Sequence, residues 1–174
     1  MSKGLQAASL TSGRRPTEIV AADRKVGMGQ IEVGQRGHVL KTLLGSCVGL
    51  TLHDRRAGVG GLAHIVLPDS RGDLTAPGKF ADTALPELLR LINELGGRTE
   101  KLIAKLAGAA NMFSSEAGKL VGEQNLLAVE ALLASRRIPI VGRHCGGTQG
   151  RRMAFYIETG EVTIDILGSE SVVL

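Results

Sequence analysis

A cysteine and a histidine that could act together lie in one glycine-rich stretch of the chain. Cys47 follows a Gly-Ser pair at the end of Thr-Leu-Leu-Gly-Ser-Cys, and His64 follows Gly-Gly-Leu-Ala. A thiol beside an imidazole can act as a nucleophile with its own base. Main-chain N–H groups near Ser46 and Cys47, at the start of an expected strand, could bind an oxyanion and favour the thiolate.

An expected β-hairpin positions the two side chains. Apolar residues alternate with small or polar ones over 48–52, which is typical of a strand with one buried face. A turn over 54–57 and a return strand over 58–67 place Cys47 directly opposite His64, with Cβ atoms about 4.5–5.5 Å apart. A shift of two residues would keep both faces but separate the pair, so the proximity depends on this register.

Each of these residue types also has a plain structural use. Free cysteine is among the most buried residue types, and a histidine in a strand is often a hydrogen-bonded core residue. The Gly-Ser pair before Cys47 and the hairpin register favour the catalytic interpretation. A metal site that joins both residues to His144 and Cys145 is disfavoured, because the chain has no C-x-x-C or H-x-x-x-H spacing. We expect no metal and interpret Cys145 as a structural thiol.

Composition narrows the class of protein. The 174 residues, 43% hydrophobic and 22% charged, are enough for one globular domain with a real core. Aromatic residues make up only 2% and the net charge of +4 is dispersed, which argues against a nucleic-acid binder. Two cysteines and no apolar stretch of membrane length predict free thiols, no membrane insertion and a cytoplasmic location.

The order of apolar and turn residues predicts an α+β domain with a mixed sheet system and helices outside. Residues 1–23 are expected to be a poorly ordered basic tail, and 24–174 a single domain that folds from about Lys25. Helices are predicted over Phe80–Leu95, with Pro86 in the first turn, and from a capping Asn125 to about Ser135. Strands are predicted over 27–33, 38–44, 48–53, 58–67, 101–106, 138–141, 152–157 and 162–167, the last two as a hairpin.

Several motifs, in order along 26–166, resemble the CheD family, the chemoreceptor glutamine deamidases of bacterial chemotaxis. Agreement of several spaced motifs is more specific than a match to one pattern. The motifs are Thr-Leu-Leu-Gly-Ser-Cys-Val-Gly-Leu from Thr42, Gly-Gly-Leu-Ala-His-Ile-Val-Leu-Pro from Gly60, Phe-Ala-Asp-Thr-Ala-Leu-Pro from Phe80, Gly-Ala-Ala-Asn-Met-Phe from Gly108, Gly-Glu-Gln-Asn from Gly122 and Gly-Gly-Thr-Gln-Gly-Arg-Arg from Gly146.

The resemblance implies a fold and a catalytic set. The fold would be a mixed β-sandwich core flanked by helices, the cysteine-hydrolase fold shared with deamidating bacterial toxins. A Cys–His–Thr set would correspond to Cys47, His64 and Thr42, with Thr51 as a second candidate hydroxyl. The implied enzyme is a protein-glutamine glutaminase, which forms a thioester on the cysteine, releases ammonia and leaves glutamate without a cofactor.

The resemblance also implies partners. The substrate would be a glutamine on the cytoplasmic helices of a chemoreceptor, and the approach glycines Gly45, Gly49, Gly60 and Gly61 would let such a helix come close to Cys47 and His64. A CheC-type phosphatase is a possible second partner. An alternative is a non-catalytic or dual-role adapter that binds receptors and CheC. Candidate oxyanion and substrate-binding residues are Gly45, Ser46, Asn111, Arg151 and Arg152. Asn111 and the 146–152 segment have turn formation as an equally good explanation.

Overall fold

The computed structural model describes residues 22–112 and 116–174, and the side chains of 113–120 lie outside that description. Most of the expected N-terminal tail, residues 1–21, also lies outside the described residues. Strand β1 (Ala22–Lys25) begins ahead of the predicted start of the folded part near Lys25.

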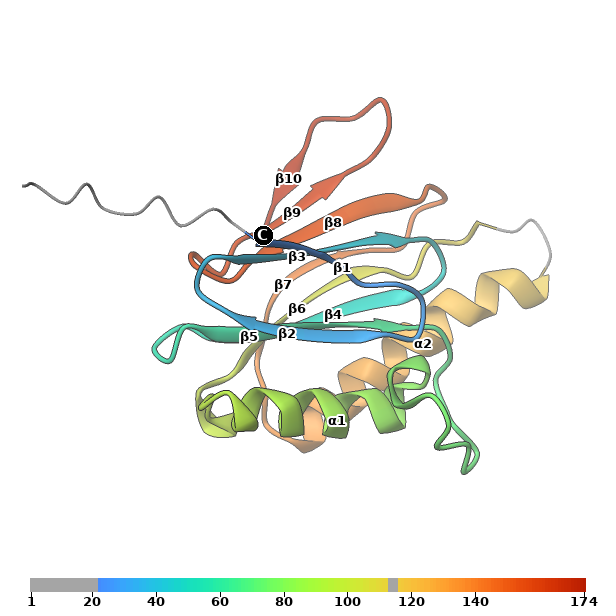
Figure 1. The fold of residues 1–174 in the computed structure, drawn as a ribbon. Helices are drawn as coiled ribbons and strands as arrows, with labels where there is room; N and C mark the ends of the chain where they lie inside the picture. The colour runs from blue at the N-terminus through green and yellow to red at the C-terminus, as the bar shows by residue number, and fades with distance from the viewer. Residues whose placement is uncertain (1–21, 113–115) are drawn as a thin grey trace, which may run out of the picture.

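Two five-stranded mixed sheets form the body of the molecule (Figure 1). Each contains one parallel pair, β1–β3 in one and β6–β7 in the other, and its remaining pairs are antiparallel. The first, which we call the open sheet, has the order β1, β3 (His38–Leu44), β8 (Arg151–Tyr156), β9 (Val162–Asp165) and β10 (Val172–Val173). The second, the central sheet, has the order β2 (Ile31–Gln35), β5 (Val59–Ile65), β4 (Val48–Asp54), β6 (Ile103–Gly108) and β7 (Ile140–Cys145).

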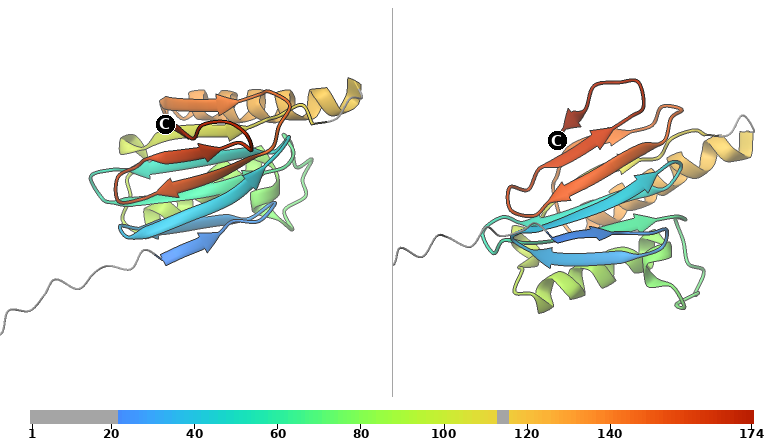
Figure 2. Two further views of the ribbon diagram at one scale, coloured as in Figure 1. Left: turned by 90° about the horizontal axis from the view of Figure 1, so that it is seen from above. Right: turned by 45° about the horizontal axis from the view of Figure 1, so that its top comes forward.

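The two sheets stack face to face, and the helices α1 (Ala81–Glu94) and α2 (Glu116–Ser135) cover the other face of the central sheet (Figure 2). One hydrophobic cluster fills the space between helices and central sheet, and a second fills the space between the sheets. The α+β class and the hairpin of β8 with β9 are therefore confirmed. The structure adds short 3₁₀ turns at Pro77–Lys79 and Thr99–Lys101.

The predicted register of the β4–β5 hairpin is wrong by two residues. Asp54 pairs with Val59, so Gly49, and not Cys47, lies opposite His64. The turn comprises residues 55–58, because the Asp54 side chain accepts main-chain N–H bonds at 3.0 Å from residues 56 and 57. Gly58 closes the turn with φ +67°, a conformation that glycine adopts without strain.

The expectation of one buried face on β4 is also wrong, since every residue of β4 and β5 is buried. On the face toward the open sheet, side chains of that sheet fill the space beside the small residues of β4 and β5. A Cβ on Gly49 would lie 2.7 Å from Sδ of Met153, and one on Gly60 would lie 2.8 Å from the Phe155 ring. The absence of side chains at Gly49 and Gly60 therefore lets the open sheet pack closely against the central sheet, and these two glycines are not accessible to a receptor helix.

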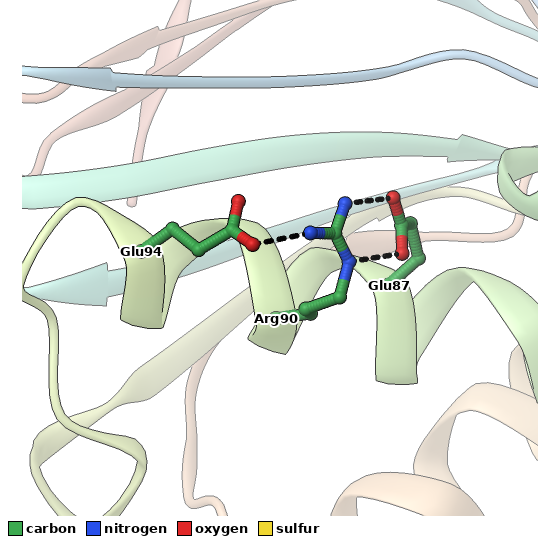
Figure 3. A network of polar contacts seen from close by, with 3 residues as sticks. All are labelled: Glu87, Arg90 and Glu94. Carbon is green, nitrogen blue, oxygen red and sulfur yellow. Dashed lines mark hydrogen bonds and ion pairs between the residues drawn. The ribbon is translucent and has the colours of Figure 1, made fainter.

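Helix α1 packs its apolar face on the central sheet and exposes a charged face. Arg90 bonds both carboxylate oxygens of Glu87, at 2.8 and 2.7 Å, and also contacts Glu94 (Figure 3). These exposed pairs contribute little to stability. Pro86 lies inside the helix, past the first turn where it was predicted. Its missing N–H costs a single helical bond, and burial of residues such as Leu88 and Ile92 holds the helix together.

Helix α2 is nearly twice as long as predicted, because Asn125 lies inside it rather than at its N-cap. The Asn125 side chain is fully buried and donates to main-chain carbonyl oxygens outside the helix. An asparagine before an apolar run is a common N-cap signal, and here tertiary contacts account for it instead.

Candidate active site

The nucleophile candidate lies in a bend that connects the two sheets. Residues 45–47 link β3 of the open sheet to β4 of the central sheet, and Cys47 is 8% exposed in the cluster between the sheets. With Gly49 opposite His64, Cys47 is a diagonal neighbour of His64 rather than a direct one. Diagonal positions lie about 7–8 Å apart at Cα, within reach of longer side chains such as histidine.

Thr42 is the residue that contacts His64 directly. Its Oγ1 lies 2.7 Å from His64 Nδ1 and 2.7 Å from the carbonyl oxygen of Val26. The hydroxyl has one proton, and the Val26 carbonyl can only accept, so that proton goes to Val26. His64 Nδ1–H must then donate to Thr42 Oγ1, and Nε2 is left with its lone pair.

The free nitrogen of His64 is the one a general base needs. His64 is 3% exposed, and its Nε2 has no hydrogen-bond partner among the described residues. Burial lowers the pKa of His64 below its ordinary value of 6.5, and the nearby Val26 carbonyl only partly opposes that effect. The imidazole is therefore neutral at pH 7, and its buried Nε2 is unprotonated.

Burial also keeps Cys47 in its thiol form. It raises the pKa of the Cys47 thiol above 9.0, and no opposing contribution accompanies it among the described residues. The resting pair is accordingly a thiol and a neutral imidazole, not the thiolate suggested by the free N–H groups of the bend. Nucleophilic attack by this sulfur would require a base that accepts its proton, and His64 is the candidate base, although no hydrogen bond joins its Nε2 to Cys47 in the described residues.

The second candidate hydroxyl, Thr51, takes no part in this arrangement. Its Oγ1 donates to the main-chain oxygen of Lys105 at 3.2 Å, across the β4–β6 pair. The geometry therefore singles out Thr42 as the residue that orients His64.

Each carbonyl oxygen of the bend accepts a hydrogen bond from a residue outside the bend. The oxygen of Gly45 accepts from Ala110 N at 2.8 Å, and the oxygen of Cys47 accepts from Ala109 N at 2.8 Å. The oxygen of Ser46 accepts from Asn125 Nδ2 at 3.3 Å. No bond within the described residues uses the N–H of Ser46 or of Cys47. Because a trans peptide points its N–H opposite to its C=O, these two N–H groups point away from the carbonyl anchors.

One glycine makes this anchoring possible. Gly108, at the end of β6, has φ +103°, and a Cβ there would lie 2.1 Å from the Cys47 oxygen. No other residue type could occupy this position without moving the nucleophile. The sequence pattern marked the Gly108 motif but not its contact with the bend.

The predicted arginines have different environments. Arg151 is 4% exposed, and its guanidinium donates to the main-chain oxygens of His144, Gly146 and Gln149. These bonds fix the glycine turn after β7, which favours a structural role for Arg151 over the predicted substrate-binding role. Arg152, by contrast, is exposed on β8.

Two clefts flank the site. One, of about 730 Å³, is lined by Thr42 and His64 along with the exposed face of the open sheet, including Lys41 and Tyr156. The other, of about 630 Å³, is lined by Gly45, Met112 and Gly150, next to the bend. Arg152 lines both clefts, whereas Cys47 lines neither of them.

Asn111 lies near the second cleft. It is exposed, and its main-chain N–H donates to the Gly147 oxygen at 2.8 Å. In the parts of the chain that the structure describes, no group of three or more metal-binding side chains comes together, and no helix is long and apolar enough to cross a membrane.

The fold and the site together define a two-sheet α+β protein with a buried thiol and a buried imidazole that is hydrogen-bonded to a threonine hydroxyl. The sequence profile of the family described as CheD chemotactic sensory transduction matches residues 66–166. The chain belongs to the CheD family.

Curated relatives extend the match over most of the chain. A probable chemoreceptor glutamine deamidase CheD of Methanococcus vannielii is 45% identical over 80% of this chain and 92% of its own length. One from Desulforamulus reducens is 44% identical over 85% of this chain and 93% of its own. The chemoreceptor glutamine deamidase CheD of Thermotoga maritima is 39% identical, over 82% and 91% respectively.

Proposed function

We propose that this protein hydrolyses glutamine side chains of chemotaxis receptors to glutamate, with Cys47 as nucleophile and His64 as base. The relatives' names supply the substrate class. The observation that carries the mechanism is the Thr42–His64 contact of 2.7 Å, which leaves the buried Nε2 unprotonated and without a hydrogen-bond partner among the described residues. A cysteine-hydrolase fold is part of the same proposal.

The reaction has two halves. The Cys47 sulfur attacks the carboxamide carbon while its proton passes to His64 Nε2, and the resulting oxyanion accepts bonds from the N–H groups of Ser46 and Cys47. The imidazolium then gives its proton to the departing ammonia as the C–N bond breaks. Water then loses a proton to Nε2 and cleaves the thioester, and the His64 imidazolium returns that proton to the Cys47 sulfur. Thr42 keeps the imidazole in the required tautomer throughout.

The substrate would enter from the cleft beside Gly45. This side of the bend is lined by exposed apolar side chains, Leu43 and Met112, and by the exposed Arg152. Gly45 is the only one of the predicted approach glycines, within the described residues, that lines a cleft. Since a receptor glutamine lies on a helix, we propose that the helix crosses this cleft.

Mass spectrometry of receptor peptides tests the proposal directly. The wild-type protein should add about 1 Da at specific glutamines, because an NH₂ group is replaced by OH. Cys47→Ala should abolish the change, while Cys145→Ala, which removes the other free cysteine, should leave it intact. Equal deamidation by wild type and Cys47→Ala would refute the assignment of the nucleophile.

An adapter function is a second proposal, supported by the exposure of Leu43, 68%, and Met112, 49%, beside the site. Such a surface could hold a receptor or a CheC-type phosphatase without chemistry. Binding of receptor membranes or of CheC by Cys47→Ala, measured by sedimentation, distinguishes this function from catalysis. Loss of binding in Leu43→Asp but not in Cys47→Ala is expected if the surface binds partners.

A further inference from the structure

We propose that Asn125 is a positioning residue that aims one donor of the oxyanion-binding site. The inference rests on the proposed function for its reaction, and on the structure for its contacts. Asn125 is 0% exposed in the middle of α2, and its Nδ2 donates to two carbonyl oxygens, Val66 at 2.8 Å and Ser46 at 3.3 Å. Both partners are pure acceptors, which fixes the NH₂ group on this side of the amide.

The bond to Ser46 acts through a single planar unit. The Ser46 carbonyl and the Cys47 N–H belong to one trans peptide, so the N–H points opposite to the oxygen that Asn125 holds. Rotation of that plane would turn the Cys47 N–H away from a tetrahedral oxyanion on the Cys47 sulfur. A donor that is preorganised in this way loses no reorganisation energy during the reaction.

The bond to Val66 links the donor to the base. Val66 follows β5 and lies two residues beyond His64, so one buried amide connects the nucleophile bend with the end of the strand that carries the imidazole. The neighbouring turn of α2 reinforces the link. A Cβ on Gly122 would lie 2.8 Å from the Ala109 oxygen, and Ala109 N in turn holds the Cys47 carbonyl.

The remaining amide atom agrees with a positioning role rather than a generic packing role. Asn125 Oδ1 is buried and has no hydrogen-bond partner among the described residues. A leucine of similar size would avoid that desolvation, yet it would also leave the Ser46 and Val66 carbonyls without this donor. The amide is thus used for its two N–H groups.

Two small reagents separate positioning from general damage, and neither needs the receptor. Iodoacetamide alkylates the Cys47 sulfur by displacing iodide, and no oxyanion forms. In contrast, p-nitrophenyl acetate transfers its acetyl group to the sulfur and releases p-nitrophenolate through a tetrahedral oxyanion. Each rate is measured at Cys47 in a Cys145→Ala background, by peptide mass spectrometry and by nitrophenolate release.

In Asn125→Leu, acetyl transfer should fall about tenfold or more, while alkylation of Cys47 stays within about twofold of its wild-type rate at each pH. Receptor deamidation should lose kcat with little change in KM. Thr51→Val, which removes a buried hydroxyl bond away from the bend, is the matched control and should keep the ratio of the two rates. An unchanged ratio in folded Asn125→Leu overturns the proposal, as does a parallel fall of both rates.

If Asn125→Leu does not fold, a second variant and a measurement on the wild-type protein still test the proposal. Asn125→Ser is smaller, keeps one hydroxyl donor and is judged by the same ratio. In the wild type, both Nδ2 protons of Asn125 should exchange with solvent far more slowly than those of the exposed Asn111, and equally fast exchange overturns the proposal. If Asn125→Leu shows the expected loss of acetyl transfer relative to alkylation but the wild-type protein does not deamidate receptors, the proposed function fails and the Asn125 inference stands.

Discussion

At the residue scale, the site depends on where a single proton resides. The Thr42 hydroxyl has one proton and two neighbours at 2.7 Å, one of which is a carbonyl that cannot donate. That count fixes the His64 tautomer without any charged residue. A carboxylate in the same place would stabilise an imidazolium, whereas a hydroxyl orients the ring and leaves its pKa low.

The first prediction concerns this orientation. Thr42→Val removes the acceptor for His64 Nδ1–H, so the ring can adopt the other tautomer or rotate. We expect kcat for deamidation to fall about 10- to 100-fold, which does not exceed the lower end of the roughly 100- to 10,000-fold that general base catalysis contributes. Thr42→Ser should recover most of it. Thr51→Val should retain activity. A larger loss of activity in Thr51→Val than in Thr42→Val would show that Thr51, and not Thr42, orients His64.

The second prediction concerns pH. Burial lowers the pKa of His64 below 6.5, and only the neutral imidazole can accept the Cys47 proton. The acid limb of activity should therefore have a pKa below 6.5, and activity should be lost as pH falls through that lowered pKa of the folded enzyme. The measurement is kcat/KM against pH. His144→Gln, which alters another histidine of lowered pKa, is the control and should leave the acid limb in place.

At the element scale, the bend and its anchors come from three separate segments of the chain, around residues 45–47, 108–110 and 125. The bend itself joins β3 to β4, β6 supplies Gly108, the turn after β6 supplies the N–H groups of 109 and 110, and α2 supplies Asn125. No single element contains the site. Its precision depends on the packing of α2 against the turn and of the open sheet against the central one.

The sequence predicted the elements better than their relation to one another. The strand over 38–44 and the β8–β9 hairpin were recognisable because their apolar alternation is local. The hairpin register was not, although Asp54 and Gly58 carry a turn signal that favours residues 55–58. The contact of Thr42 with His64 requires the stacking of two sheets, and it was supplied by family resemblance rather than by periodicity.

The third prediction separates two adjacent arginines. Arg151→Met should lower the free energy of unfolding by about 2–4 kcal/mol, because three main-chain oxygens lose a charged donor. Arg152→Met should change it by less than about 0.5 kcal/mol, because that side chain is exposed. Urea denaturation of both variants gives these values. Equal stability of the two would show that Arg151 does not hold the turn.

The fourth prediction concerns partner binding, for which Arg152 is the remaining candidate. Arg152→Glu should weaken binding to receptor-containing membranes, more at low salt than at high salt, because the interaction is between exposed charges. Alkylation of Cys47 should stay the same, since no hydrogen bond among the described residues joins the Arg152 side chain to the bend. Sedimentation at two salt concentrations is the measurement. Unchanged binding at low salt would remove Arg152 from the interface.

At the scale of the whole molecule, buried polar side chains connect the two sheets. His53 on β4 donates from Nε2 to the Ile157 oxygen at 3.1 Å, beyond the end of β8, and lies edge-on to the Phe155 ring. Thr42 and His64 make a second connection from β3 to β5. Both histidines are more than nine-tenths buried, so the interface between the sheets contains two imidazoles whose pKa values burial lowers.

The last prediction follows from these two connections. Burial lowers the pKa of His53, as it does for His64; the Ile157 carbonyl and Asp54 oppose the shift, while Lys105 and Arg36 add to it. The unfolded chain therefore binds more protons than the folded one between the lowered pKa values and about 6.5. Stability should be complete above about pH 6.5 and fall as pH decreases, by at most about 1.4 kcal/mol per pH unit for each histidine. Urea denaturation between pH 7.5 and 5 measures this slope.

His53→Gln keeps a donor for Ile157 but does not titrate, so it should be less stable at pH 7.5 yet show a shallower slope. A double His53→Gln, His64→Gln variant with the wild-type slope would place the acid sensitivity outside the interface between the sheets.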